Sequence, residues 1–124
     1  MLRYVVMFCI VVGLALSDFV TGFIKACVTN SVESSKMRKG GLNKLSELVV
    51  MATACGLEIG IEMLGRNSGG EELAKITGLV CASAIFGYIA FMEVISILEN
   101  YAAINPQANG WISKLIKRLK SKEE

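Results

Sequence analysis

The sequence predicts an all-α membrane protein with three transmembrane helices and a C-terminal amphipathic helix at the membrane surface. The 124 residues are 53% hydrophobic and only 19% charged, whereas a soluble domain averages about 25% charged residues. The apolar residues gather in three blocks, each close to the roughly 20 residues that a helix needs to cross a bilayer. A basic segment follows the first block and a basic tail follows the third. We therefore expect a single membrane domain over residues 1–124.

The first predicted span covers about residues 4–27. Tyr4–Ser17 carries no charge, and the apolar run continues past Asp18 to Ile24, which disfavours a cleaved signal peptide. Asp18, Gly22 and Lys25 lie on one helical face. A carboxylate inside the bilayer costs about 2.5–3.5 kcal/mol on insertion scales. We therefore expect Asp18 to face protein, paired with Lys25 or with a neighbouring subunit; the alternative places Asp18 in the headgroup region.

The segment 28–44 is predicted to be a cytoplasmic loop. Its stretch Glu33–Lys44 has a net charge of +3, and short loops rich in Lys and Arg stay on the cytoplasmic side. Alternation of the spans then places the N-terminus outside and the C-terminus in the cytoplasm. The residues that set this topology are Lys36, Arg38, Lys39 and Lys44.

The second predicted span, about residues 45–64, has two different faces. One carries acids, with Glu58 and Glu62 among them, and the opposite face carries small residues four apart, Ala52, Gly56 and Gly60. Small residues at this spacing let helix backbones approach closely. We expect the small-residue face to pack and the acidic face to meet water or another polar surface. The alternative is that the two glutamates mark the outer end of a shorter span.

An external turn is predicted over 65–73 and a third span over about 74–98. Gly78 and Ala82 again place small residues four apart, and Glu93, Ser96 and Asn100 share one face near the end of the span. This polar face indicates either an intersubunit contact or an interfacial helix end. Together with the acids of the other spans we expect an oligomer or pore face made of Asp18, Gly22, Glu58, Glu62, Glu93, Ser96, Glu99 and Asn100.

The tail, residues 109–122, is predicted to be a basic amphipathic helix after the helix-ending Pro106. Its apolar residues fall on one arc that includes an interfacial tryptophan, which suits an anionic lipid surface. Attached to three spans, the helix has the membrane as its nearest polyanion, so we expect lipid and not nucleic acid as its partner. The expected membrane-surface residues are Trp111, Lys114, Lys117, Arg118 and Lys120.

Catalysis is not expected. The chain has no His, and its four cysteines are scattered without the close spacing of a metal site or a redox pair. The sequence also has no glycine-rich phosphate loop and no cluster of metal-ligating residues. We therefore expect no enzyme activity, no cofactor and no metal.

Several segments in order resemble the small bacteriophage holins, in particular the family that includes the holin-like proteins of clostridial toxin secretion. They are the stretch from Asp18 to Ala26, the Ser35–Gly40 basic segment, Lys44, and the stretch Glu93–Asn100. The family typically shows Asp-x-x-x-Gly-x-x-x-Ala, a Ser-Lys/basic/Gly loop, and Glu-x-x-Ser-x-x-Glu-Asn. The chain departs in having Met92 where the family often has Asn.

The resemblance implies a phage or prophage protein that homo-oligomerises in the host plasma membrane and opens lesions. An endolysin, or sometimes a toxin, then leaves through them, and no stable contact with the endolysin is required. Two alternatives from the residues remain. Glu58 is a candidate mid-membrane carboxylate for a proton- or ion-translocating subunit, and the basic tail is a candidate recruiting segment of an accessory protein.

Overall fold

The computed structural model describes the backbone of residues 1–68 and 82–123. The chain forms α1 (Leu2–Val28), α2 (Ser34–Ser68), α4 (Ala82–Ile104), the short 3₁₀ helix η1 (Pro106–Ala108) and α5 (Asn109–Glu123). No strand occurs among the described residues. The predicted class, three long apolar helices followed by a C-terminal helix, is confirmed.

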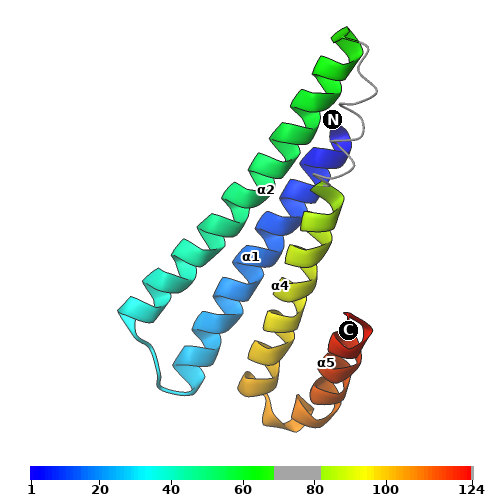
Figure 1. The fold of residues 1–124 in the computed structure, drawn as a ribbon. Coiled ribbons are helices and arrows are strands. Elements are labelled where there is room, and N and C mark those ends of the chain that lie inside the picture. Colours follow the sequence, from blue (N-terminus) through cyan, green and yellow to red (C-terminus); the bar gives the residue numbers. More distant parts are fainter. Residues whose placement is uncertain (69–81, 124) are drawn as a thin grey trace.

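The three long helices form one bundle in which α1 lies between α2 and α4 (Figure 1). Helices α1 and α4 run in the same direction and α2 runs in the opposite one. The α1–α2 turn and the α4–α5 connection therefore lie at the same end, and the N-terminus lies at the other (Figure 1). We call the first end, where Val28, Ser34 and Ile104 are the helix termini, the basic end, and the other the N-terminal end.

All three long helices are long and apolar enough to span a membrane. In the most apolar stretch of each helix only 22% of the residues are buried within the bundle. Most of the apolar surface therefore faces outwards, where lipid would cover it. Exposed large apolar side chains occur on every long helix, among them Val6, Ile10, Phe23, Val49, Leu57, Tyr88 and Met92.

Helix α2 begins at Ser34, so the predicted loop over 28–44 is mostly helical. Only residues 29–33 lie outside the helices. The Lys, Arg and Met side chains of this stretch are good helix formers, and Gly40 and Gly41 do not interrupt a helix that continues into an apolar span. With 35 residues, α2 is about 52 Å long at 1.5 Å per residue. It therefore extends well beyond a hydrocarbon core of about 30 Å.

The predicted external turn and third span overlap a segment that the structure does not describe. Helix α2 continues to Ser68, and residues 69–73 of the turn and 74–81 of the span lie outside the described residues. Helix α4 continues six residues beyond the expected end of the span, to Ile104. The third span thus reaches further toward the basic end than the sequence pattern indicates.

The core is a column of apolar side chains shared by the three helices. Val11 of α1 and Met51 of α2 are fully buried, and Ile89 of α4 packs with them. Aliphatic and sulfur-containing side chains fill the space between them, which is the close packing that helices need when lipid offers no hydrophobic drive for association.

The C-terminal helix α5 turns back alongside α4 (Figure 1). Ile112 is fully buried, and it packs with Ala102 of α4. The apolar arc of α5 is therefore divided, because Trp111 remains 57% exposed while Ile112 and Ile116 contact protein. The sequence pattern predicts the apolar face of α5, but α4 covers part of that face and only the rest is open to a membrane.

Candidate functional site

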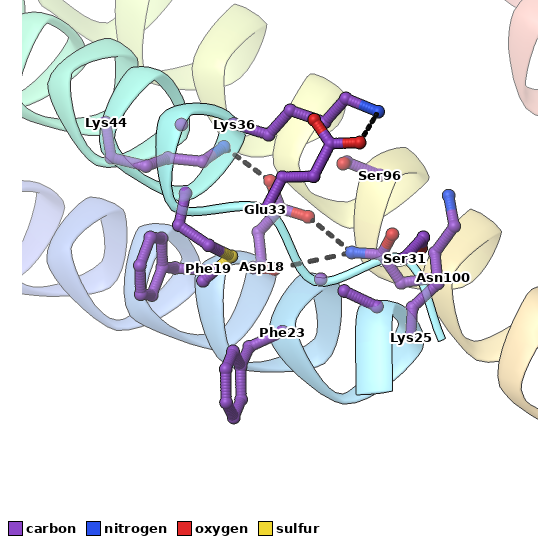
Figure 2. Close-up of a pocket in the computed structure, with 14 residues that line it drawn as sticks. Asp18, Phe19, Phe23, Lys25, Ser31, Glu33, Lys36, Lys44, Ser96 and Asn100 are labelled. Carbon is purple, nitrogen blue, oxygen red and sulfur yellow. Dashed lines mark hydrogen bonds and ion pairs between the residues drawn. The ribbon is translucent and has the colours of Figure 1, made fainter. Parts of the chain in front are cut away.

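Three charged side chains, one from each long helix, meet inside the bundle near the basic end. The ammonium group of Lys44 (α2) forms ion pairs with the carboxylates of Asp18 (α1) and Glu93 (α4). Asp18 and Glu93 are 7% and 2% exposed. Figure 2 shows Lys44 reaching across to Asp18. We call these three residues, with Asn100, the basic-end layer.

The helix register brings these residues to one depth. Asp18 lies ten residues before the end of α1, Lys44 ten residues after the start of α2, and Glu93 eleven residues before the end of α4. All three helix termini are at the basic end, so each side chain lies roughly 15 Å from it. Extension of α2 back to Ser34 is what carries Lys44 into the bundle.

Asn100 completes the basic-end layer. Its side-chain amide donates a hydrogen bond to Asp18 Oδ1 at 3.0 Å (Figure 2). The same amide also donates to the hydroxyl of Thr21 at 3.1 Å. Gly22 lies against it, since a Cβ there would be 3.7 Å from the Asn100 amide nitrogen. The structure thus brings together four residues of the predicted polar face, Asp18, Gly22, Glu93 and Asn100, within a single chain.

The basic-end layer holds more carboxylates than ammonium groups. Glu47 also approaches Lys44, with 3.9 Å between Oε1 and Nζ. Oε2 of Glu47 and Oε2 of Glu93 are buried without a hydrogen-bond partner among the described residues. One ammonium group therefore serves three acids, and Glu47 is the most distant and the most exposed of them, with 32% of its side chain accessible.

We expect Glu47→Gln to leave the bundle as stable as the parent chain or to stabilise it by about 1 kcal/mol. The substitution removes a negative charge that lacks a full partner, and an amide costs less to bury than a carboxylate. Thermal unfolding of the detergent-solubilised protein, followed by circular dichroism, measures the effect. A loss of stability equal to that caused by replacing Glu93 with Gln would contradict this charge balance.

A second polar group lies at the N-terminal end and is centred on Glu58. Oε1 of Glu58 accepts hydrogen bonds from the guanidinium of Arg3 at 2.9 Å and from the hydroxyl of Tyr4 at 3.0 Å. Oε2 accepts one from the backbone N–H of Ala82 at 2.7 Å. Glu58 is 5% exposed. We call Arg3, Tyr4 and Glu58 the N-terminal layer; it joins α1 and α2, and the Ala82 N–H links it to α4.

The two layers are separated by the apolar core. Tyr4 precedes Asp18 by fourteen residues, and Lys44 precedes Glu58 by the same number, which corresponds to roughly 21 Å along a helix. The buried acids that looked costly in the sequence, Asp18, Glu58 and Glu93, therefore each have a partner within one chain, at two depths. Ion pairs and hydrogen bonds of this kind are how intramembrane charges are accommodated.

The small-residue stripe of α2 faces away from α1 and α4. Ala52 and Gly56 are exposed and Gly60 is only partly covered, and a Cβ at either glycine would meet nothing within 4 Å. Within one chain the expected roles of the two α2 faces are thus exchanged, because the acidic stripe packs and the small-residue stripe is open. Of the other predicted packing pair, Ala82 is fully buried and Gly78 lies outside the described residues.

The remaining predicted residues are at the surface. Glu62 is exposed, Ser96 is partly buried, and Glu99 is exposed and pairs with Lys120 of α5 at 3.5 Å. Lys25 is exposed and is not the partner of Asp18. The other basic residues predicted for the loop and the tail are also exposed: Lys36, Arg38, Lys39, Lys114, Lys117 and Arg118.

Sequence reasoning missed three residues of the layers. Lys44 was assigned to a topology-setting loop and is instead the centre of the basic-end layer. Arg3 and Tyr4 received no role, although Arg3 is the only charged residue before Asp18. A lone arginine at the start of one apolar span and a glutamate in the apolar part of another are the signal that could have paired Arg3 with Glu58.

The model of the bacteriophage holin family matches residues 2–121, nearly the whole chain. The chain belongs to the bacteriophage holin family. Comparison with curated proteins and with solved structures gave no match. Holins are non-enzymatic membrane-pore proteins, and with three helices long and apolar enough to span a membrane this holin is a multi-pass plasma-membrane protein.

Proposed function

We propose that this holin homo-oligomerises in the host plasma membrane and opens lesions that release an endolysin for host lysis. The observation that carries the proposal is the division of the bundle into an apolar outer surface and two buried ionic layers. A chain with this division can accumulate in lipid without exposing charge. The same chain holds the polar side chains that a water-filled opening needs. The resemblance adds a secreted toxin as the alternative cargo.

Lesion formation on this proposal requires the helices of one chain to separate. Asp18, Glu58 and Glu93 are buried in the closed bundle and cannot line an opening until α2 moves away from α1 and α4. In the assembled state, contacts between subunits would replace contacts within a chain. The proposed pore face remains Asp18, Gly22, Glu58, Glu62, Glu93, Ser96, Glu99 and Asn100.

The open stripe of α2 is the proposed first contact between subunits. Ala52, Gly56 and Gly60 form a stripe of small residues, and no described side chain lies against either glycine. Backbones that approach closely at small residues gain van der Waals contact that lipid tails do not provide. Two closed bundles can therefore associate through α2 before either of them opens.

The proposed orientation has the N-terminus outside and the basic end in the cytoplasm. The turn after α1, the first turns of α2 and the basic helix α5 are all at this end (Figure 1). Their Lys and Arg residues satisfy the positive-inside rule together. In this orientation α5 lies where the remaining exposed part of its apolar face, with Trp111, can meet anionic lipid.

The test is expression in bacteria together with a cytoplasmic endolysin that has no export signal. We expect induction to collapse the membrane potential, reported by a potential-sensitive dye, and to cause abrupt lysis only when both proteins are present. The control is a catalytically inactive endolysin, which should leave depolarisation intact and abolish lysis. Cells that stay polarised, with the endolysin retained in the cytoplasm, would refute the proposal.

The contacts of Glu58 argue against an ion-carrier role for it. A carrier carboxylate must be reached by its ion, whereas Glu58 is 5% exposed and engaged by Arg3, Tyr4 and the Ala82 backbone at once. It also lies at the depth of the first turn of α1 and not midway along that helix. Glu58 thus serves to hold three helices together in the closed bundle.

A further inference from the structure

The basic end contains a cavity of about 390 Å³ between α1, the first turns of α2 and α4. We propose that this cavity binds the phosphate headgroup of an anionic phospholipid. The proposal goes beyond lesion formation, because it concerns the closed bundle and holds whether or not the chain lyses cells. It rests on the charges, the hydrogen-bonding groups and the apolar wall of the cavity.

Three lysines and two acids line the cavity, and two of the lysines are available to a ligand. Asp18 and Lys44 are bound to each other in the basic-end layer. Lys36 pairs with Glu33 at 3.3 Å, but both side chains are more than half exposed, and such a pair is weak and easily exchanged. Lys25, in the last turn of α1, has no ion pair with any described residue.

The ammonium groups of Lys25 and Lys36 lie on the side of the cavity where Ser96 is found (Figure 2). The Ser96 hydroxyl forms no hydrogen bond with the described part of the chain and is available as a donor. Two ammonium groups and a hydroxyl are groups that bind phosphate oxygens, and charge-assisted hydrogen bonds are the strong kind. A monoanionic phosphodiester therefore fits this side.

The opposite wall of the cavity is apolar and opens to the lipid-facing surface. It includes Phe19 and Phe23, which are 37% and 44% exposed and point away from the lysines (Figure 2). A free phosphate would leave this wall without a partner, whereas acyl chains would cover it. The cavity also lies at the end of α1, where the helix leaves the hydrocarbon region and lipid phosphates are found. Basic pockets between membrane helices bind anionic headgroups in this way.

The charge arm of the test uses native mass spectrometry of the detergent-purified protein. Phosphatidylglycerol should bind in a saturable 1:1 complex, and phosphatidylcholine should bind at least about tenfold more weakly. The double variant Lys25→Gln/Lys36→Gln should lose about tenfold or more in affinity for phosphatidylglycerol. The matched control Arg38→Gln/Lys39→Gln removes the same charge from an exposed stretch of α2, outside the cavity, and should leave the 1:1 complex unchanged.

The volume arm fills the cavity without changing its charge. Gly40 lines the cavity, and a Cβ there would meet nothing within 4 Å. Gly40→Leu should therefore fold, exclude the lipid and weaken phosphatidylglycerol binding by about tenfold or more. Gly13→Leu is the control, because Gly13 has the same open space but lies outside the cavity.

The outcomes separate a lipid site from its alternatives. Loss of binding in both cavity variants, with both controls unchanged, supports the proposal. Equal binding of phosphatidylcholine, or an equal loss of phosphatidylglycerol binding in the Arg38/Lys39 control, would show general attraction to the membrane surface and overturn it. Displacement of phosphatidylglycerol by millimolar inorganic phosphate would identify a free-anion site and overturn it as well. Helical circular dichroism establishes that each variant is folded, and either folded cavity variant decides the question.

Discussion

Lys44→Met is expected to destabilise the closed bundle by about 3–5 kcal/mol, the usual consequence of removing one partner from a buried ion pair. The substitution keeps a long, unbranched side chain but leaves the carboxylates of Asp18 and Glu93 without their shared ammonium group. Unpaired carboxylates inside a membrane bundle favour any conformation in which water reaches them. Thermal unfolding in detergent should report the loss, and in cells the variant should depolarise the membrane earlier or fail to accumulate.

A triple variant that also neutralises the two acids assigns this effect to charge. Lys44→Met combined with Asp18→Asn and Glu93→Gln removes the unpaired carboxylates, and a large part of the lost stability should return, because neutral isosteres of a buried ionic group are well tolerated. Lys39→Met, an exposed lysine on the same helix, is the matched control and should have little effect. If the control were as destabilising as Lys44→Met, or the triple variant no more stable than the single one, the ionic layer would not be what holds the basic end.

Glu58→Ala is expected to cost about 2–4 kcal/mol and to loosen the N-terminal end of the bundle. The buried Tyr4 hydroxyl and the Ala82 backbone N–H would lose their acceptor, and each unsatisfied buried group costs about 1–3 kcal/mol. The Arg3 contact contributes less, because the Arg3 side chain is 61% exposed. Hydrogen exchange should increase in the first turns of α1 and remain unchanged at the basic end.

Two further variants, Glu58→Gln and Glu99→Ala, serve as comparisons for Glu58→Ala. Glutamine keeps an oxygen for the Ala82 N–H and loses only the charge. We therefore expect a smaller loss of stability than in Glu58→Ala, and a shift in the timing of lysis without loss of lysis. Glu99 makes an exposed pair with Lys120, which is worth little, so its replacement should be nearly neutral. Unchanged hydrogen exchange at the N-terminal end of Glu58→Ala would argue against the N-terminal layer, and complete loss of depolarisation in Glu58→Gln would favour an ion carrier.

The sequence is sufficient to predict three apolar helices and the face that each polar residue occupies. Helical spacing places Asp18 beside Gly22, and Glu93 on the face of Asn100, and the structure brings these four residues together. Such predictions succeed because they depend on periodicity within one helix. The cost of a carboxylate in lipid further predicts that Asp18 has a partner.

The identity of that partner depends on the register between helices, and the periodicity within one helix does not determine this register. Lys44 looks like part of a basic loop until α2 is known to begin at Ser34. The contact between Arg3 and Glu58 joins residues 55 positions apart, and nothing local in either helix indicates it. These contacts follow only from how far each helix extends toward a common end of the bundle.

The apolar patterns also do not indicate whether protein or lipid covers each apolar face. A small-residue stripe allows close helix packing, but the spacing of Ala52 and Gly56 does not say whether the second helix belongs to the same chain. The apolar arc of α5 likewise suits lipid and protein, and the structure places Ile112 against α4 while Trp111 stays exposed. In each case burial against the same chain and burial against another chain or lipid have similar free energies. The tertiary arrangement therefore decides which of them covers the face.

Thiol labelling of intact cells tests the central claim most directly, that three helices of each chain thread the membrane with the basic end inside. In a background with the natural cysteines replaced by Ala, Leu2→Cys and Lys39→Cys are labelled with a membrane-impermeant maleimide before lysis begins, and the membranes are then washed at alkaline pH. We predict that the chain stays in the washed membranes, that Leu2→Cys is labelled in intact cells, and that Lys39→Cys is labelled only after permeabilisation. Release of the chain by the wash, or labelling of both positions from outside, would contradict the account.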